Sequence, residues 1–353
     1  MKAKILVVAT ANTPFLIDRV KMSCESEHEI YWFTASKECP SHFCKTFHLQ
    51  LKPFLGPLNR LISTFYFLWV YLRVRPDILH VHWAVFPVAL VTFPKKLIVS
   101  TMGSDINSDA YAGIKKKLVG LLLRKADIIT VKSAVMAKTV SSYGVNSSSI
   151  KEITWGIDQT FFERFKSEPS QKKTMTFFSP RSIKPLYRIP AIVEAFAKFH
   201  SELPNSKLVL AQMHQFPEEY QKIKEIISQY EIEDAISFLG TLSKNQMIEA
   251  LEQSDAVVSY AEVDGMPQTL YEAMAIGCYP IFTNLSNYDS LLSHQKNAYL
   301  CSDEEELYKG FTYTYDLWEN DRLSTILTEN HNLSFSIANK TEQTLELHKL
   351  YKI

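Results

Sequence analysis

The sequence lacks several features that would assign it to common classes of protein. Lys plus Arg and Asp plus Glu both number 38 in 353 residues, so no net charge favours nucleic acid or an acidic polymer as a partner. The five cysteines, at positions 24, 39, 44, 278 and 301, are odd in number and show no zinc-type spacing. We therefore expect reduced thiols, as in a cytoplasm, and no metal site built on cysteine.

No segment is typical of export or of a membrane span. The first ten residues, MKAKILVVAT, run into an apolar strand without the cleavage region of a signal peptide, so we expect no export. The most membrane-like segment, Leu61 to Val74, contains Ser63 and Thr64 and is shorter than the ~20 apolar residues of a transmembrane helix. It is more typical of a core-packed helix, although its aromatic residues also suit a helix lying on a bilayer.

The chain does contain two series of short apolar runs that alternate with longer amphipathic stretches. The first series predicts strands at 4–10, 28–34, 77–83, 95–101 and 126–133, with helices at 58–73 and 112–125. After a polar stretch at 166–173, the best candidate for a linker, the second series predicts strands at 174–180, 206–212, 236–240, 255–260 and 279–284. Its helices are predicted at 189–201, 217–230 and 244–253. The pattern indicates two α/β domains with parallel sheets. No G-x-G-x-x-G follows any predicted strand, which disfavours a nicotinamide dehydrogenase.

The segment 254–284 carries the strongest functional signal. Pro267 suits the first position of a helix and Gly277 suits the end of one, so we predict a helix from Pro267 to Ile276. Side chains tilt toward a helix N-terminus, so Glu272 can reach the loop above and accept two hydrogen bonds from ribose hydroxyls. The amides of Met266, Gln268 and Thr269 and the helix dipole attract phosphate. Gly265 allows close approach, and Asp264 is better suited to sugar hydroxyls than to phosphate. Alternatively, the two acids only stabilise a helix N-terminus.

These residues carry a family resemblance. The stretch DGMPQTLYEAMAIGCYPI, residues 264–281, resembles the Glu, seven residues, Glu signature of glycosyltransferase family 4, a family of retaining enzymes with the GT-B fold. Asp264 replaces the first glutamate, and Met266-Pro267 replaces the usual Phe-Gly. The segments 75–83, 100–106, 149–162 and 335–353 resemble further family stretches in the same order. Met102 stands in one of these where many members have histidine.

The resemblance implies a fold and a domain division. It implies two Rossmann-like α/β domains that face each other across a cleft, with a C-terminal helix that returns to the first domain. We expect an acceptor-side domain at 1–158, completed by 337–353, and a nucleotide-sugar domain at 159–336.

The resemblance also implies site residues in the second domain. Glu272 would hold the ribose and Asp264 the donor sugar, and Arg181 would stabilise the leaving diphosphate. Lys184 and Arg188 compete for the role of second cation, and ordinary surface charge is the alternative for both. The expected contacts of the nucleotide-sugar are Gly265, Met266, Pro267, Gln268, Thr269, Glu272 and Arg188. No Asp-x-Asp points to the metal-dependent alternative fold, so we expect neither a metal nor another cofactor.

The first domain is expected to bind the acceptor. His82 ends a predicted strand, and Gly103, Ser104 and Asp105 follow the next one, where they could bind sugar hydroxyls or cap a helix. The resemblance implies a glycan or lipid-linked acceptor, as in bacterial glycolipid or surface polysaccharide synthesis, at the cytoplasmic face of a membrane. The basic helix 111–125 would then serve peripheral membrane association, or alternatively present an ordinary solvated face. The alternatives are a nucleotide-sugar hydrolase or epimerase of this fold, or a non-catalytic sugar-binding subunit.

Overall fold

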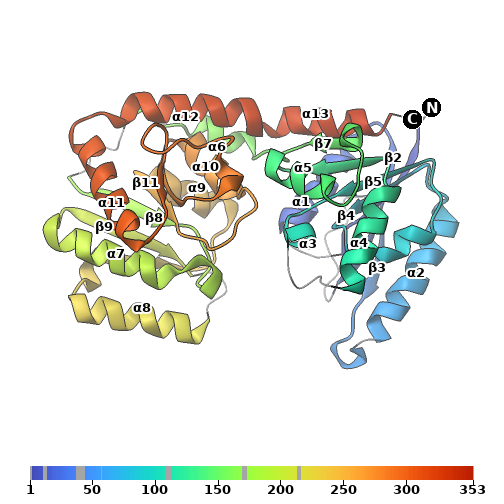
Figure 1. Ribbon diagram of the computed structural model, residues 1–353, viewed down its shortest axis with the longest axis horizontal. Helices are drawn as coiled ribbons and strands as arrows, with labels where there is room; N and C mark the ends of the chain where they lie inside the picture. The colour runs from blue at the N-terminus through green and yellow to red at the C-terminus, as the bar shows by residue number, and fades with distance from the viewer. Residues whose placement is uncertain are drawn as a thin grey trace. The chain divides into compact units, whose positions relative to one another are not determined.

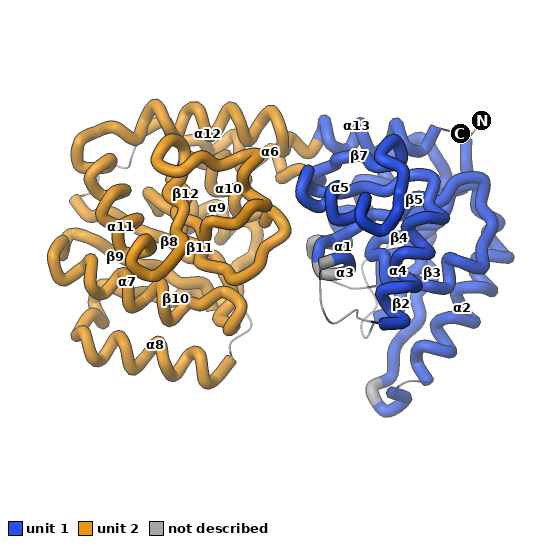
Figure 2. Tube along the Cα trace, viewed as in Figure 1, with its two compact units in different colours: residues 1–155, 341–353 blue, residues 156–340 orange. Residues whose placement is uncertain are grey.

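The computed structural model describes residues 2–10, 14–36, 44–56, 58–107, 113–168, 173–212 and 216–352 (Figure 1). The chain divides into two compact units, which are coloured separately in Figure 2. Unit 1 comprises Met1–Trp155 and Thr341–Ile353, and unit 2 comprises Gly156–Lys340. The division lies a few residues from the sequence-based boundaries, and the C-terminal segment belongs to the first unit.

Unit 1 is built on a parallel sheet of seven strands in the order β3-β2-β1-β4-β5-β6-β7. The strands are β1 (Lys4–Val8), β2 (Glu29–Ser36), β3 (Lys45–Gln50), β4 (Ile78–His82), β5 (Lys96–Ser100), β6 (Ile128–Val131) and β7 (Ile150–Glu152). The five predicted strands are present. The two unpredicted strands, β3 and β7, form the edges of the sheet.

Helices cover both faces of this sheet (Figure 1). They are α1 (Pro14–Cys24), α2 (Leu58–Val74), α3 (Ser104–Asn107), α4 (Ile114–Lys125), α5 (Ala134–Ser141) and α13 (Lys340–Leu350), which begins at the unit boundary. Side chains alternate along β1, so Leu6 and Val8 join the core under α2 and α4, while Ile5 and Val7 join the core under α1 and α13. The near-continuous apolar strands thus reflect burial on both sheet faces.

Unit 2 contains a parallel sheet of six strands in the order β10-β9-β8-β11-β12-β13. The strands are β8 (Met175–Ser179), β9 (Ser206–Ala211), β10 (Ile236–Leu239), β11 (Ala256–Ser259), β12 (Tyr279–Thr283) and β13 (Tyr299–Cys301). The helices are α6 (Gln159–Glu163), α7 (Ile189–Glu202), α8 (Pro217–Tyr230), α9 (Lys244–Glu252), α10 (Gln268–Ile276), α11 (Glu304–Glu319) and α12 (Leu323–Ala338). All five predicted strands and the predicted helices are present within a few residues.

The polar stretch 166–173 is not the link between the units, which corrects the sequence-based choice. Lys166 donates its backbone N–H to the carbonyl of Ile276 at 2.9 Å, and both residues lie inside unit 2. The chain instead passes from one unit to the other at Trp155 and Gly156. Residues 169–172 lie outside the described residues.

The strand order positions the sites. Both sheets are doubly wound, and their order reverses between β1 and β4 in unit 1 and between β8 and β11 in unit 2. Ligands of such sheets bind beyond the carboxyl ends of the strands at this switch point. The loops after β1, β4, β8 and β11 are therefore the expected ligand-binding positions.

Across the described part of the chain, no helix is both long and apolar enough to cross a membrane. The membrane-like segment Leu61 to Val74 lies within α2.

Candidate functional site

The predicted donor residues gather at the switch point of unit 2. Arg181 follows β8, Ser259 ends β11, Asp264 lies in the loop after β11, and Glu272 lies in the second turn of α10. Elements distant in the sequence thus bring one guanidinium and two carboxylates together.

Arg181 is held in place from three sides. Its side chain forms a salt bridge with Asp264, and its Nε donates to Ser259 Oγ at 2.9 Å. The guanidinium also lies over the ring of Tyr187, with its carbon 5.0 Å from the ring centroid. Only 9% of Arg181 is exposed, so a charge binding beside it would be weakly screened.

Both carboxylate oxygens of Asp264 already have partners within unit 2. Its Oδ1 accepts the N–H of Gly265 at 2.7 Å, Oδ2 pairs with Arg181, and the backbone carbonyl accepts from Asn287 Nδ2. Burial, followed by the charge of Asp264, raises the pKa of the neighbouring Tyr288 phenol. The amide of Gly265 is therefore occupied by the Asp264 carboxylate.

Glu272 differs from Asp264 because it has no hydrogen-bond or salt-bridge partner among the described residues. The residue is half-buried. Burial raises the pKa of its carboxyl to about 7, although the nearby charge of Arg181 acts in the opposite direction. A half-buried carboxyl without donors indicates a place for a ligand that supplies them.

The helix start beside Glu272 offers further groups. The helix begins at Gln268, after Pro267, and no side chain caps its N-terminus. Met266 has a left-handed backbone with φ of 63°, and Gln268 Nε2 donates to the carbonyl of Gly156 at 2.9 Å. Within the described chain, no acceptor takes the amides of Met266, Gln268 or Thr269. These amides can donate hydrogen bonds to an anion at the positive end of the helix dipole.

Three buried side-chain oxygens near these residues lack hydrogen-bond partners in the part of the chain that the structure describes. They are the hydroxyl oxygens of Ser179, which ends β8, and Thr269, in the first turn of α10, and Oδ1 of Asn287. Buried polar groups are ordinarily satisfied, so unsatisfied ones at a switch point favour a polar ligand there.

The two competing cations differ in their surroundings. Arg188 has a left-handed backbone, donates from Nε to the carbonyl of Tyr260 at 3.0 Å, and lies 3.8 Å from the Tyr260 ring centroid. Lys184 is half-buried, and its ammonium has no partner among the described residues. The Lys184 ammonium is thus uncommitted in the described chain, whereas Arg188 is anchored on Tyr260, and the choice of second cation stays a prediction.

In unit 1, His82 lies at the end of β4 and is 3% exposed. Neither ring nitrogen has a hydrogen-bond partner in the described ranges. Burial, with smaller contributions from His80 and Arg19, lowers the His82 pKa well below its ordinary value, so the ring is neutral. His80, by contrast, is hydrogen-bonded at both ring nitrogens. Nδ1 lies 2.8 Å from the Tyr351 hydroxyl, and Nε2 lies 2.7 Å from Ser100 Oγ.

Asp105 organises a loop rather than presenting free oxygens. Its carboxylate accepts the N–H groups of Met102 and Gly103 at 2.9 Å and of Ala84 at 2.8 Å, and only 1% of the residue is exposed. Gly103 has φ of 112° and open space where a side chain would stand. Asp105 thus ties the loops after β4 and β5 together, and a direct acceptor contact stays a prediction. The side chain of Ser104 and the loop residues 11–13 lie outside the described residues.

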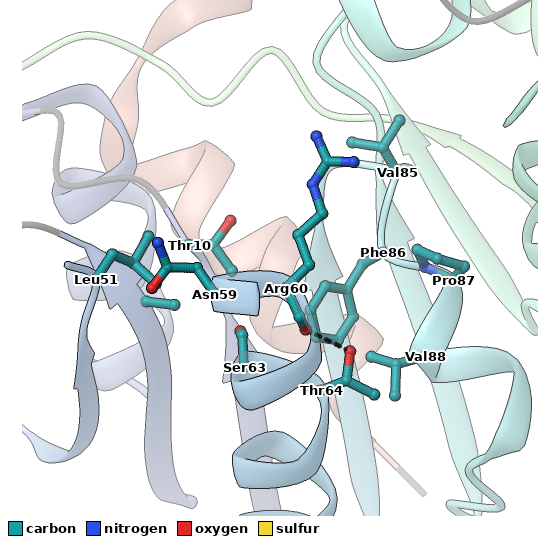
Figure 3. Close-up of a pocket in the computed structure, with 11 residues that line it drawn as sticks. Thr10, Leu51, Asn59, Arg60, Ser63, Thr64, Val85, Phe86, Pro87 and Val88 are labelled. Carbon is teal, nitrogen blue, oxygen red and sulfur yellow. Dashed lines mark hydrogen bonds between the residues drawn. The ribbon is translucent and has the colours of Figure 1, made fainter. Parts of the chain in front are cut away.

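The switch point of unit 1 contains a cavity of about 400 Å³ (Figure 3). Thr10 follows β1, Ala35 and Leu51 lie at the ends of β2 and β3, and residues 85–88 follow β4. The first turns of α2 complete the lining with Asn59, Arg60, Ser63 and Thr64. A second cavity of about 360 Å³ shares Arg60, Val85 and Pro87 with it and reaches Lys115 on α4.

Figure 3 shows Arg60 extending from α2 toward Val85. Within the described residues its guanidinium has no partner. The sequence analysis missed this cavity, although a signal was present. Asn59, Arg60, Ser63 and Thr64 are the polar positions in the first two turns of a largely apolar helix, at spacings that place them on one side.

Among the described residues, no group of three or more His, Cys, Asp and Glu side chains could hold a metal ion. The expectation of a metal-free reaction stays a prediction.

Comparison with known proteins relates this geometry to a family and a fold. Anabaena HepE, described in a complex with UDP and glucose, matches with a TM-score of 0.79 at 11% identity over 99% of each chain. Sucrose-phosphate synthase from Thermosynechococcus elongatus matches with a TM-score of 0.80 at 14% identity, over 99% of this chain and 98% of that one. A glycosyltransferase from Rickettsia africae matches with a TM-score of 0.76 at 15% identity, over 99% of this chain and 98% of that one. The chain therefore has the GT-B fold, and residues 160–325, most of unit 2, match the model of the family Glycosyl transferases group 1.

Proposed function

We propose that the protein is a retaining glycosyltransferase of family 4 type, which transfers a sugar from a nucleoside diphosphate to a hydroxyl acceptor. One observation carries the proposal: Glu272, half-buried and without a partner in the described chain, lies close enough to Arg181 for the guanidinium to act on its pKa. A ribose would supply the missing hydrogen-bond donors, and the attached diphosphate would meet the cation. The match of residues 160–325 to the group 1 family supports this assignment.

In the proposed complex, unit 2 binds the donor. Glu272 accepts from the ribose hydroxyls, while Arg181, Lys184 and the amides at the start of α10 hold the diphosphate. Asp264 contacts sugar hydroxyls and thereby leaves its salt bridge with Arg181. This exchange would free the guanidinium for the phosphate at the moment the donor binds.

The transfer breaks the bond between the anomeric carbon and the diphosphate oxygen. The electron pair of that bond stays on the diphosphate, where Arg181 and Lys184 stabilise the added charge. The acceptor oxygen attacks from the same face, and a diphosphate oxygen takes its proton. We propose that these cations and amides act without a metal, so that activity is unchanged by EDTA.

Unit 1 is proposed to bind a glycan or lipid-linked acceptor, with His82, Gly103, Ser104 and Asp105 on the acceptor side. We place the reaction in the cytoplasm, at the inner face of a bacterial membrane, in glycolipid or surface polysaccharide synthesis. Because HepE is described with UDP and glucose, UDP-sugars are the first donors to test.

The test is a binding and turnover screen with uridine, guanosine and adenosine diphosphates and their sugars. Ligand binding to the native state raises its apparent stability, so one base should raise the melting temperature. Glu272→Ala and Arg181→Ala should abolish the shift and lower turnover by roughly 100-fold or more. Glu262→Ala is the matched control, since Glu262 is an exposed acid of the same loop.

The proposal is wrong if both variants fold and keep full turnover. Sugar released equally with and without an acceptor would indicate a hydrolase, and a changed sugar on the recovered donor would indicate an epimerase. A donor-dependent shift with no product from any acceptor would favour a sugar-binding subunit.

A further inference from the structure

Helix α2 presents an apolar stripe to solvent. Phe65 and Leu72 are each 69% exposed and Trp69 is 51% exposed. The solvent-facing stripe consists of Leu58, Leu61, Ile62, Phe65, Trp69 and Leu72. Its members follow Leu58 by three, four, seven, eleven and fourteen positions, which is the spacing of one helix face.

The opposite face of the same helix is already used. Phe67, Val70 and Val74 are buried in the core of unit 1. A surface helix ordinarily places polar residues opposite its buried face, and α2 instead places aromatic and aliphatic residues there. The packing of unit 1 therefore leaves the α2 stripe largely exposed, and α2 lies on the outside of that unit (Figure 1).

Neighbouring side chains hold the α2 stripe in position. The Trp69 ring stacks on Tyr66 at 5.7 Å and meets Phe47 edge-on at 6.3 Å, between centroids. The Phe93 N–H donates to the Tyr71 hydroxyl at 3.1 Å, so the Phe93 loop is tied to α2. Phe93 is itself 85% exposed and extends the apolar surface.

Positive charge predominates in the part of the sequence that carries this surface and lies beside it at two points. Residues 51–125 contain eleven Lys and Arg against three Asp and no Glu, although the whole chain is neutral. Asp77 forms a salt bridge with Lys95, and Asp105 is buried. Two of the three acids therefore contribute little negative potential at this surface. The Arg73 guanidinium lies 5.6 Å from the Trp69 ring centroid, and Lys125 Nζ lies 4.6 Å from that of Phe93.

We propose that unit 1 docks on an anionic lipid bilayer through the α2 stripe, which lies in the interface rather than spanning it. Apolar side chains enter the boundary between head groups and acyl chains, and the basic residues meet the lipid phosphates. A second copy of the chain is a poorer occupant, because it would bring the same positive charge to the contact. An anionic surface satisfies both features at once.

The docked orientation has a consequence for the cavity of unit 1. Asn59, Arg60, Ser63 and Thr64 line that cavity and lie on the same turns of α2 as Leu58, Leu61 and Ile62. The bilayer surface would therefore meet the rim of the cavity beside the unpaired Arg60. If the proposed transfer is correct, its acceptor is a membrane-borne molecule with an anionic group; the docking itself does not depend on that transfer.

The experiment is co-sedimentation of the full chain with vesicles of phosphatidylcholine alone and with added phosphatidylglycerol. Binding is expected to the anionic vesicles, to weaken with salt, and to fall by roughly ten-fold or more in Phe65→Ser/Trp69→Ser. Leu345→Ser is the matched control, because Leu345 is 50% exposed on α13 of the same unit. A nucleotide thermal shift on each variant reports folding and the donor site separately.

Brominated lipids give a second readout. They should quench the fluorescence of the bound protein, and Trp69→Phe should remove most of that quenching, because Trp69 is the most exposed of the five tryptophans. Trp32 and Trp155 are buried, and Trp83 and Trp318 are half-buried, the latter in unit 2. Equal binding of Phe65→Ser/Trp69→Ser and of the wild-type protein to anionic vesicles would overturn the proposal. The proposal would also be overturned if Leu345→Ser lost vesicle binding to the same extent, or if Trp69→Phe left the quenching unchanged. A dimer of the chain that dissociates when Trp69 is changed would likewise overturn it.

Discussion

At the scale of single residues, two carboxylates on neighbouring elements are held in different states. Asp264 is paired with Arg181 and with the amide of Gly265, so its charge is compensated. Glu272 has no such partner in the described chain, and its pKa is about 7 because of burial. Near neutral pH, Glu272 is therefore mixed between its protonated and ionised forms, and a ribose would favour the ionised one.

The first prediction concerns Glu272→Gln. The native carboxyl has a pKa of about 7 against an ordinary 4.5, so the native state binds the extra proton between these values. The stability that the protonated Glu272 carboxyl contributes is fully present below about pH 4.5 and is lost as the pH rises through 7. At pH 8 the variant should be more stable by on the order of 1–3 kcal/mol, and at pH 4.5 equal.

Urea unfolding at the two pH values measures this difference. The same variant should bind the nucleotide more weakly by roughly ten-fold or more, because an amide is a poorer acceptor for ribose hydroxyls. A variant that is less stable at pH 8, or that binds the nucleotide unchanged, would contradict the state assigned to Glu272.

The second prediction concerns Asp264→Asn. Loss of the carboxylate leaves the Arg181 charge uncompensated, so a nucleoside diphosphate without sugar should bind more tightly, by roughly three- to ten-fold. Turnover of the sugar donor should fall, because the contact to sugar hydroxyls weakens. Calorimetry with the diphosphate and initial rates with its sugar separate the two effects. Weaker diphosphate binding would show that Asp264 supports the phosphate site instead of opposing it.

At the scale of elements, burial decided which parts could be predicted. The interior strands, such as β1, read as apolar runs because both sheet faces are covered. The edge strands β3 and β7 were missed, since β3 is half-exposed along its length and β7 has three residues with two exposed. Burial alone does not explain β13, which has only three residues, all buried. Such segments become strands only through pairing with a neighbour, which a sequence pattern does not reveal.

The site was predictable to the same extent. Arg181, Asp264 and Glu272 were singled out by strand ends, a helix start and the family resemblance, and the structure brings them together at one switch point, while their roles stay predictions. The occupied amide of Gly265 depends on how its loop folds, which no local pattern indicates. The polar side of α2 marks one wall of the cavity beside Arg60, but the loops that complete the cavity meet only in space.

The third prediction concerns the end of α10. Gly277 has φ of 95°, and a Cβ there would lie 2.4 Å from the backbone carbonyl oxygen of Lys166. Gly277→Ala therefore meets both backbone strain and a clash with main chain, and should destabilise unit 2 by roughly 2–4 kcal/mol. Gly240→Ala is the control, because a Cβ at Gly240 meets nothing within 4 Å. Thermal or urea unfolding measures the stability of both variants. Equal, small losses of stability would show that the backbone around Lys166 shifts to make room for the added Cβ.

At the scale of the whole molecule, the chain leaves unit 1 after Trp155 and returns to it at Thr341. The returning segment is fixed by a buried polar chain within unit 1. The Tyr351 hydroxyl bonds to Ser23 Oγ at 2.7 Å and to His80 Nδ1 at 2.8 Å. Burial lowers the His80 pKa to about 3, so this ring is neutral and the contact is a neutral hydrogen bond. The last helix thus completes the fold of the first unit.

The last prediction follows from this arrangement. Tyr351→Phe keeps the ring but leaves the buried Ser23 and His80 without one partner each, so unit 1 should lose roughly 1–3 kcal/mol. Nucleotide binding to unit 2 should not change, because its proposed contacts lie within Gly156–Lys340. Hydrogen exchange should accordingly rise in the unit 1 core and not around α10. Leu345→Ser, exposed on the same helix, is the control and should leave exchange unchanged. Uniform loss of protection in both units would show instead that they unfold together.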